Sequence, residues 1–243
     1  MARKQQLRDQ RTGTVINATS RKQESEIIQA LQLTVEHLQT KFGQDMRLAH
    51  GAHWLLKDIV AELRHTYPDT EFHYYFESSS IRPDGGILYL QGPSGDALSY
   101  PILIAEVKNQ GTNDLRAQEG LPPQARGNAI ERLGKNLIGL RTALMRESIF
   151  PFVCFGYGCD FDANSSILDR VSTMAMFGRL NETYLHNEEG GKLNRGSFYF
   201  RRERWTVAEM ASVMQDIAER SVLYYFSKYR EESFRAAQQG SEH

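Results

Sequence analysis

The stretch IRPDGGILYLQGPSGDALSYPILIAEVK, residues 81–108, predicts a β-hairpin. Its centre, GPSGD at 92–96, is rich in turn formers, and the runs on either side are apolar, β-branched and aromatic, as strands are. A turn there places Asp84 opposite Glu106. Because side chains alternate along a strand, Glu106 and Lys108 share one face. The hairpin is therefore expected to present Asp84, Glu106 and Lys108 as one cluster.

This cluster has a chemical use. Hard divalent ions such as Mg²⁺ prefer carboxylate and carbonyl oxygens, and one or two acidic side chains plus substrate phosphate commonly hold them. Asp84 and Glu106 fit that need, and Lys108 can orient an attacking water or stabilise the transition state. The alternative is structural: Asp84 forms an Asp-Gly turn, and Glu106 and Lys108 form a solvated pair at a strand edge. The residues alone leave both interpretations open.

Three segments carry a wider pattern: SSIRPDGG at 79–86, AEVKNQG at 105–111, and GNAIER at 127–132 with Lys135-Asn136 after it. In order and content they resemble the EcoRI/MunI group of type II restriction endonucleases, within the PD-(D/E)xK nuclease superfamily. The resemblance extends from about Ser78 to Phe155.

The resemblance implies a fold, a site and partners. The fold class is α/β, with a mixed central β-sheet flanked by helices and a restriction-endonuclease-like PD-(D/E)xK core. Asp84, Glu106 and Lys108 are then catalytic, and Asp84, Glu106 and Val107 hold Mg²⁺. The expected partners are double-stranded DNA and a second subunit in a homodimer.

The segment around Asn128 is a candidate for reading DNA bases. Asparagine can bond bidentately to adenine, and a small apolar residue can meet the thymine methyl. The residues equally fit an ordinary helix N-cap followed by a solvated Glu131-Arg132 pair. In the family that the chain resembles, Gly-Asn-Ala reads an AATT interior, and the following Glu and Arg tie DNA contacts to the partner subunit and the catalytic centre. This implies DNA-binding roles for Gly127, Asn128, Ala129, Glu131 and Arg132.

Arg126 bears on the outer base pair of the recognition site. The EcoRI branch has alanine at this place, whereas the MunI branch, which cuts CAATTG, has an arginine that it uses there. Because a guanidinium fork suits guanine, CAATTG is the first expectation and GAATTC the second. The alternative for Arg126 is a phosphate contact. Arg201, Arg202 and Arg204 have no such match, and they can be interpreted as a phosphate-contacting surface.

Composition limits the classes of protein. The chain has 243 residues, with 29 Lys plus Arg against 30 Asp plus Glu and a formal net charge of −1. A uniformly basic coat is excluded, so any DNA contact must use a local patch. No apolar run approaches a membrane span and no signal-peptide core is evident, which predicts a soluble, cytoplasmic protein. Cys154 and Cys159 lack zinc spacing and are expected to be reduced and structural.

Patterning along the chain predicts a mobile N-terminal arm at 1–18 and a single endonuclease domain at 19–243. The loop at 109–126 is long enough to be functional. Thr206-Val207-Ala208-Glu209 is a capping box that opens a long helix. The other expected helices lie at about 21–42, from 54 to before Pro68, 128–146 and 165–177, and the expected strands at 71–77, 86–90, 100–105, 152–157 and 197–202.

The function that follows is a homodimeric, Mg²⁺-dependent type II restriction endonuclease that cuts a short palindrome with an AATT core. One alternative is a PD-(D/E)xK scaffold that binds DNA or a partner without cutting; the presence of Asp84, Glu106 and Lys108 together argues against it. The other is a sequence-independent repair nuclease, which gives the Asn128 segment no base-reading role. A host would need a companion DNA methyltransferase, with no direct contact implied.

Overall fold

A five-stranded sheet lies at the centre of the computed structural model, which describes residues 15–92, 99–109, 116, 118–122, 128–158, 161, 166–175, 179–187 and 194–236. The spatial order is β1-β4-β5-β6-β7. β1 and β5 are antiparallel to β4, whereas β5, β6 and β7 are parallel, so the predicted mixed sheet is confirmed. The strands are β1 (Leu48–Gly51), β4 (Gly86–Gln91), β5 (Ser99–Asn109), β6 (Phe152–Tyr157) and β7 (Ser197–Arg201).

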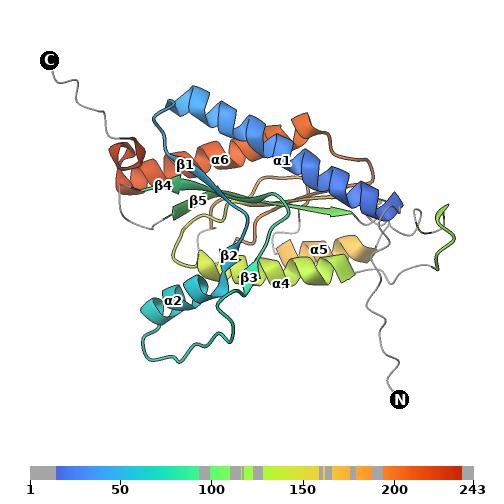
Figure 1. The fold of residues 1–243 in the computed structure, drawn as a ribbon, viewed down its shortest axis with the longest axis horizontal. Coiled ribbons are helices and arrows are strands. Elements are labelled where there is room, and N and C mark those ends of the chain that lie inside the picture. The colour runs from blue at the N-terminus through green and yellow to red at the C-terminus, as the bar shows by residue number, and fades with distance from the viewer. Residues whose placement is uncertain are drawn as a thin grey trace.

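Helices cover both faces of the sheet, as Figure 1 shows. α1 and α6 pack against each other on one face, and α4 and α5 lie on the other. Their bounds are α1 (Val15–Phe42), α4 (Asn128–Ala143), α5 (Ser166–Ala175) and α6 (Val207–Tyr229). The α/β fold class with a central sheet flanked by helices is therefore confirmed.

Strand β5 supplies side chains alternately to the two layers. Ala105 and Val107 are buried in the apolar cluster shared with α1 and α6, whereas Ile104 is buried in the cluster shared with α4 and α5. The same alternation turns Glu106 and Lys108 toward the α4 and α5 side of the sheet. The fold thus decides on which side the acidic cluster lies.

The predicted hairpin is present. β4 and β5 pair with Gly86 opposite Ala105 and Gln91 opposite Ser99, and the register shifts between Leu88 and Tyr89. Such a shift is a β-bulge, which locally increases the twist of a strand. The predicted turn at 93–96 lies outside the described residues.

A smaller unit lies beside the sheet. β2 (Trp54–Leu55) pairs with β3 (Ser80–Ile81), and α2 (Leu56–Thr66) packs against α4. Strand β3 leads directly to the turn that carries Asp84. A short 3₁₀ helix, η2 (Glu231–Phe234), follows α6.

One predicted strand is wrong. Residues 71–77 form no strand, and Tyr75 and Phe76 are exposed to 92% and 71%. Aromatic and polar residues alternate here as they do in a strand. A strand forms, however, only where it can pair with a neighbouring strand, and the alternation alone does not show whether one is present. Here the chain instead turns, with Ser79 N–H donating to Phe76 O.

Other boundaries also differ from the prediction. β5 continues to Asn109, beyond the strand expected at 100–105, and α1 begins at Val15 rather than near residue 21; residues 1–14 lie outside the described part. Trp54 and Leu55 belong to β2 and not to the helix that follows, and α4 ends at Ala143 rather than near Arg146.

The capping box of α6 is confirmed. The Thr206 hydroxyl accepts a hydrogen bond from Glu209 N–H, and the Glu209 carboxylate accepts one from Thr206 N–H. Among the described helices, none combines the length and the apolar character that crossing a bilayer requires.

Candidate active site

Asp84 lies in a tight turn that opens strand β4. Gly86 N–H donates to Pro83 O at 3.0 Å and closes the turn. Gly86 has φ +73°, and a Cβ on it would lie 2.3 Å from His50 Nε2, so only glycine fits there. The His50 ring is 3.1 Å from Gly85 O and supports the turn from the neighbouring strand β1.

The structure brings Asp84, Glu106 and Lys108 into direct contact. Asp84 N–H donates to Glu106 Oε2 at 3.0 Å, and Val107 N–H donates to Asp84 Oδ2 at 3.3 Å. The Lys108 ammonium donates to Asp84 Oδ2 at 2.9 Å and forms an ion pair with Glu106 Oε1. The two strands of the hairpin therefore form the cluster that the sequence predicts.

The three charges differ in exposure. The Glu106 side chain is 1% exposed, against 17% for Lys108 and 29% for Asp84. Burial raises the pKa of Glu106, Lys108 opposes this rise, and the negative charge of Asp84 adds to it. For Lys108, burial lowers the pKa, but the charges of Glu106 and Asp84 outweigh it and leave the pKa raised. Lys108 thus stays cationic beside the two carboxyl groups.

Cys154 lies opposite Glu106 on strand β6. It is fully buried, and burial raises the pKa of its thiol. A buried thiol with a raised pKa is a poor nucleophile, which agrees with the structural role that the sequence predicts. Cys159 lies outside the described residues.

The cluster has the chemistry of a hard-metal site. Glu106 Oε1 is buried, and its partner is the Lys108 ammonium, with which it forms an ion pair. Within the part of the chain that the structure describes, no group of three or more His, Cys, Asp or Glu side chains is arranged so that it could hold a metal ion. Two carboxylates and the nearby main-chain carbonyl of Val107 match the preferred coordination of Mg²⁺. This ion binds one or two carboxylates and completes its coordination shell with water or phosphate oxygens. The oxygens present therefore fit such an ion.

The expected base-reading segment is only partly described. Arg126 and Gly127 lie outside the described residues, and Asn128 and Ala129 start α4 with side chains that are likewise outside them. Glu131 and Arg132 lie in the first turns of α4 and are exposed. Figure 1 shows α4 running back along the sheet, so its first turn lies toward the end of β5 that carries the acidic cluster.

Arg201 and Arg204 do not form the open basic surface that the sequence suggested. Arg201 makes a bidentate pair with Glu209 and stacks 3.7 Å over the ring of Trp205. Arg204 forms an ion pair with Glu26 of α1. Both guanidinium groups therefore form contacts within the fold. Arg201 links strand β7 to α6, and Arg204 links the loop after β7 to α1.

The chain is similar to known proteins. A family model described as restriction endonuclease EcoRI matches residues 10–166. The chain belongs to the EcoRI family of restriction endonucleases. The type II restriction enzyme RsrI of Cereibacter sphaeroides is 30% identical over 200 residues, covering 68% of this chain and 72% of that protein. The type II restriction enzyme EcoRI of Escherichia coli is 28% identical over 201 residues, with the same two coverages.

Membership in the EcoRI family identifies the chain as a type II restriction enzyme, a hydrolase that cleaves DNA at specific sites. The match at 10–166 includes the acidic cluster and the start of α4. It favours this function over a non-cleaving scaffold or a sequence-independent repair nuclease.

Sequence reasoning missed His50. Its ring touches the turn that holds Asp84, yet it lies 34 positions earlier in the chain. No local pattern marks it, because the contact arises from the pairing of β1 with β4.

Proposed function

We propose that this restriction endonuclease cleaves double-stranded DNA with Mg²⁺, using Asp84, Glu106 and Lys108. The observation that carries the proposal is the almost fully buried Glu106, which accepts from Asp84 N–H through Oε2 and pairs with Lys108 through Oε1, so that two carboxylates share one ammonium. Burying a charge is costly unless it is paired or binds a metal. A purely structural role would not need such a group.

Each of these residues has its own proposed role. Asp84, Glu106 and the Val107 carbonyl would hold the ion, which neutralises charge on the phosphate and lowers the pKa of a bound water. Lys108 orients the attacking water and stabilises the negative charge that develops on the phosphoryl oxygens. The attacking water gives up a proton as its oxygen bonds to phosphorus, the bond from phosphorus to one sugar oxygen breaks, and that oxygen takes up a proton, which leaves a phosphomonoester and a hydroxyl group.

For recognition, we propose a short palindrome with AATT at its centre. The support is the Gly127-Asn128-Ala129 resemblance, together with the position of the α4 start toward the catalytic end of β5. Asn128 would bond to adenine and Ala129 would meet a thymine methyl. Arg126 would read the next pair outward, which favours CAATTG over GAATTC.

A palindromic DNA site has twofold symmetry, and a dimer with twofold symmetry matches it. We therefore propose a homodimer in which each subunit cuts one strand. Glu131 and Arg132 are exposed at the start of α4 and are available to link DNA contacts to the partner subunit. A methyltransferase of the host would protect the same sites.

Digestion of a sequenced plasmid with the protein and Mg²⁺ tests the proposal. Discrete fragments ending at CAATTG sites are expected, and EDTA should stop cleavage. Fragments at unrelated sequences would overturn the AATT assignment, and equal cleavage in EDTA would overturn the metal assignment. Sedimentation of the protein on a cognate duplex checks for two subunits per site.

A further inference from the structure

The Lys108 ammonium bridges the two carboxylates of the catalytic cluster. It donates to Asp84 Oδ2 at 2.9 Å and forms an ion pair with Glu106 Oε1, so it contacts one oxygen of each acid. In the ranges that the structure describes, no other cationic side chain pairs with either carboxylate. Two acids therefore share one positive charge.

A divalent ion held by Asp84 and Glu106 would need the same oxygens. The second oxygen of Glu106, Oε2, already accepts from Asp84 N–H, which favours Oε1 as the ligand, and Oε1 is the oxygen that faces Lys108. Mg²⁺ lies about 2.0–2.1 Å from its ligand oxygens, and an ammonium nitrogen lies about 2.7–2.9 Å from a charged acceptor. An ion that shares even one oxygen with Lys108 is therefore no more than about 5 Å from the ammonium.

At that distance a divalent ion and an ammonium repel each other. The energy between two charges rises severalfold when they leave bulk water for a protein interior. The Glu106 side chain is 1% exposed and the Lys108 side chain 17%, so water screens the repulsion poorly. The ion and the bridging ammonium therefore compete for the two carboxylates.

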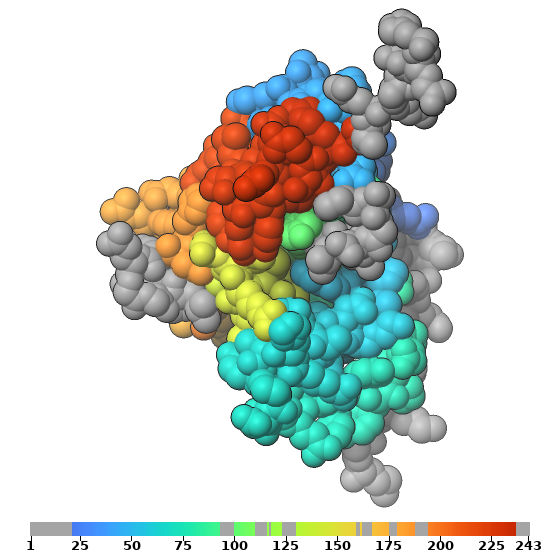
Figure 2. Space-filling view, turned by 90° about the vertical axis from the view of Figure 1, so that its left-hand side faces the viewer, coloured from blue at the N-terminus to red at the C-terminus, as the bar shows by residue number. Residues whose placement is uncertain are grey.

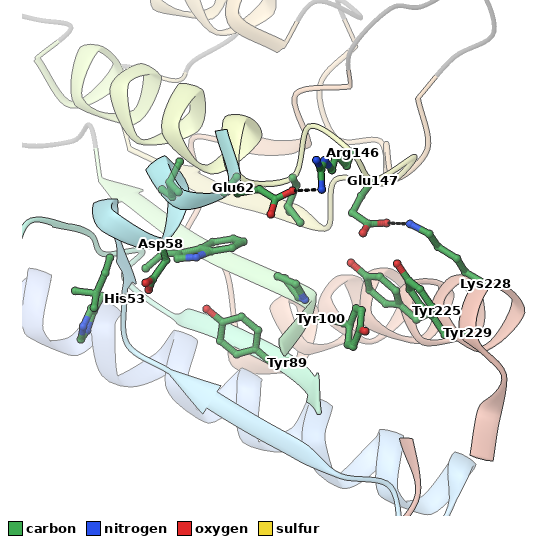
Figure 3. Close-up of a pocket in the computed structure, with 16 residues that line it drawn as sticks. His53, Asp58, Glu62, Tyr89, Tyr100, Arg146, Glu147, Tyr225, Lys228 and Tyr229 are labelled. Atoms are coloured by element: carbon green, nitrogen blue, oxygen red, sulfur yellow. Dashed lines mark hydrogen bonds and ion pairs between the residues drawn. The ribbon is translucent and has the colours of Figure 1, made fainter. Parts of the chain in front are cut away.

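Lys228 provides a contrast within the same fold. It lies near the end of α6, at the end of the molecule that faces the viewer in Figure 2, and Figure 3 shows it beside Glu147 in the wall of an aromatic cavity. The aromatic cavity has a volume of about 620 Å³, and the aromatic side chains that line it are Trp54, Tyr89, Tyr100, Tyr225 and Tyr229. Lys228 and Glu147 are 2.7 Å apart, and their charges balance. With both acids ionised, the cluster around Lys108 instead keeps one net negative charge, which attracts a further cation.

We propose that Lys108 limits the affinity of the catalytic cluster for a divalent ion, because its ammonium bridges Asp84 and Glu106 and must release at least one of them when the ion binds. The inference rests on the proposed function, which supplies the ion. Lysine carries a compact charge on a flexible four-carbon stem, so the ammonium can move while the main chain of β5 stays in place. Once released, it is free to contact the phosphate, so metal binding is coupled to the catalytic position of Lys108.

Calorimetry of Mn²⁺ binding to the DNA-free protein tests the competition, since Mn²⁺ prefers the same carboxylate, carbonyl and water ligands as Mg²⁺. Lys108→Met removes the charge and keeps a flexible stem. It should bind Mn²⁺ at least about tenfold more tightly, because the ion no longer displaces a charge-assisted contact. Lys108→Arg keeps the charge and should gain little. Titration at about pH 8 keeps protons from replacing Lys108 as the competitor on the carboxyl groups.

Two further variants locate the effect. Lys228→Met is the matched control, the same substitution at a lysine that pairs with one carboxylate outside the cluster, and its Mn²⁺ affinity should be unchanged. Asp84→Ala should lose Mn²⁺ binding. Mn²⁺ binding by Lys108→Met that is equal to or weaker than that of the unmodified protein would overturn the inference and leave the proposed metal site intact. Absence of Mn²⁺ binding by the unmodified protein would overturn both.

Proton exchange of the lysine Nζ groups, followed by ¹⁵N magnetic resonance, gives a readout in the unmodified protein and decides the matter if Lys108→Met does not fold. An ammonium held by two carboxylates exchanges its protons slowly with water. Saturating Mg²⁺ should speed this exchange at Lys108 by about tenfold or more, the factor for loss of one charged hydrogen bond. Exchange at Lys228 should not change. Unaltered exchange at Lys108 in the Mg²⁺-saturated protein would show that the ammonium is not released and would refute the inference.

Discussion

Glu106 and Glu209 each lie beside a basic side chain, yet their surroundings are opposite. Burial raises the pKa of Glu106 although the Lys108 ammonium opposes the rise, and the negative charge of Asp84 adds to it. Hydrogen bonds from Arg201 and then from Thr206 lower the pKa of Glu209 to about 2. Glu209 is 42% exposed and both of its oxygens accept hydrogen bonds from Arg201.

The difference separates two uses of a carboxylate. Glu209 caps a helix and pairs with Arg201, so every contact favours its charged form and the folded state. Glu106 is held where its charge is unfavourable, next to another carboxylate. Proteins keep such conflicts mainly at functional sites, where chemistry needs them. Substitutions around Glu106 should therefore reduce DNA cleavage, whereas substitutions around Glu209 should reduce the stability of the fold.

The largest effect is expected in the catalytic cluster. Asp84→Ala, Glu106→Ala and Lys108→Ala should each reduce DNA cleavage by at least ~10²-fold, because transition-state charge stabilisation is lost. Specific binding should remain, since the proposed role of these side chains is to hold the metal and act on the phosphate, not to contact the bases. Single-turnover cleavage in Mg²⁺ and binding in Ca²⁺ measure the two properties. Glu209→Gln is the matched control and should cut normally; cleavage by Glu106→Ala at the unmodified rate would disprove the metal-site assignment.

The next effect concerns the arginines. Arg126→Ala should lose about 1–3 kcal/mol of discrimination at the outer base pair of NAATTN duplexes, if its guanidinium reads guanine. Arg201→Ala should leave discrimination unchanged, because Arg201 is engaged by Glu209 and Trp205. Cleavage of the duplex series checks both. A uniform loss over all sequences, with a salt slope shallower by about one unit, would show instead that Arg126 contacts phosphate.

A smaller effect is expected at the cap of α6. Thr206→Ala removes the side-chain acceptor for Glu209 N–H and should cost about 1 kcal/mol of unfolding free energy. In a chain of this size that corresponds to a fall in Tm of roughly 2–4 °C. Thermal unfolding measures it. Thr206→Ser keeps the hydroxyl and should restore most of the stability, whereas cleavage should be unchanged in both variants.

The smallest effect is the pH dependence of the Glu209 contribution. Because its folded pKa lies below its ordinary value, Glu209 stabilises the fold above pH 4.5, and this contribution is lost as the pH falls toward about 2. An exposed pair is worth about 1 kcal/mol or less. Denaturant unfolding should therefore show Glu209→Gln less stable at pH 7, with the gap closing in acid. A gap that widens in acid would contradict the assigned direction.

Local patterns predicted much of the structure. The hairpin and the capping box follow from residues close together in the sequence, and the contacts among Asp84, Glu106 and Lys108 follow from the hairpin. The same patterns misjudged residues 71–77, because alternation cannot show whether a neighbouring strand exists. The contacts of Arg201 with Glu209 and Trp205 could not be predicted either, since they form only in the folded chain.

The sequence by itself determined the chemistry of this protein, because a strand period and a short turn suffice to bring two carboxylates and a lysine together. Only the tertiary structure decided how those groups behave. The packing of β6 and the α4 layer buries Glu106 and so raises its pKa, and the pairing of β1 with β4 sets His50 against the turn. The aromatic cavity also exists only in the fold, since its walls come from segments far apart in the chain. Burial and non-local contacts depend on which surfaces meet, and no local pattern encodes that.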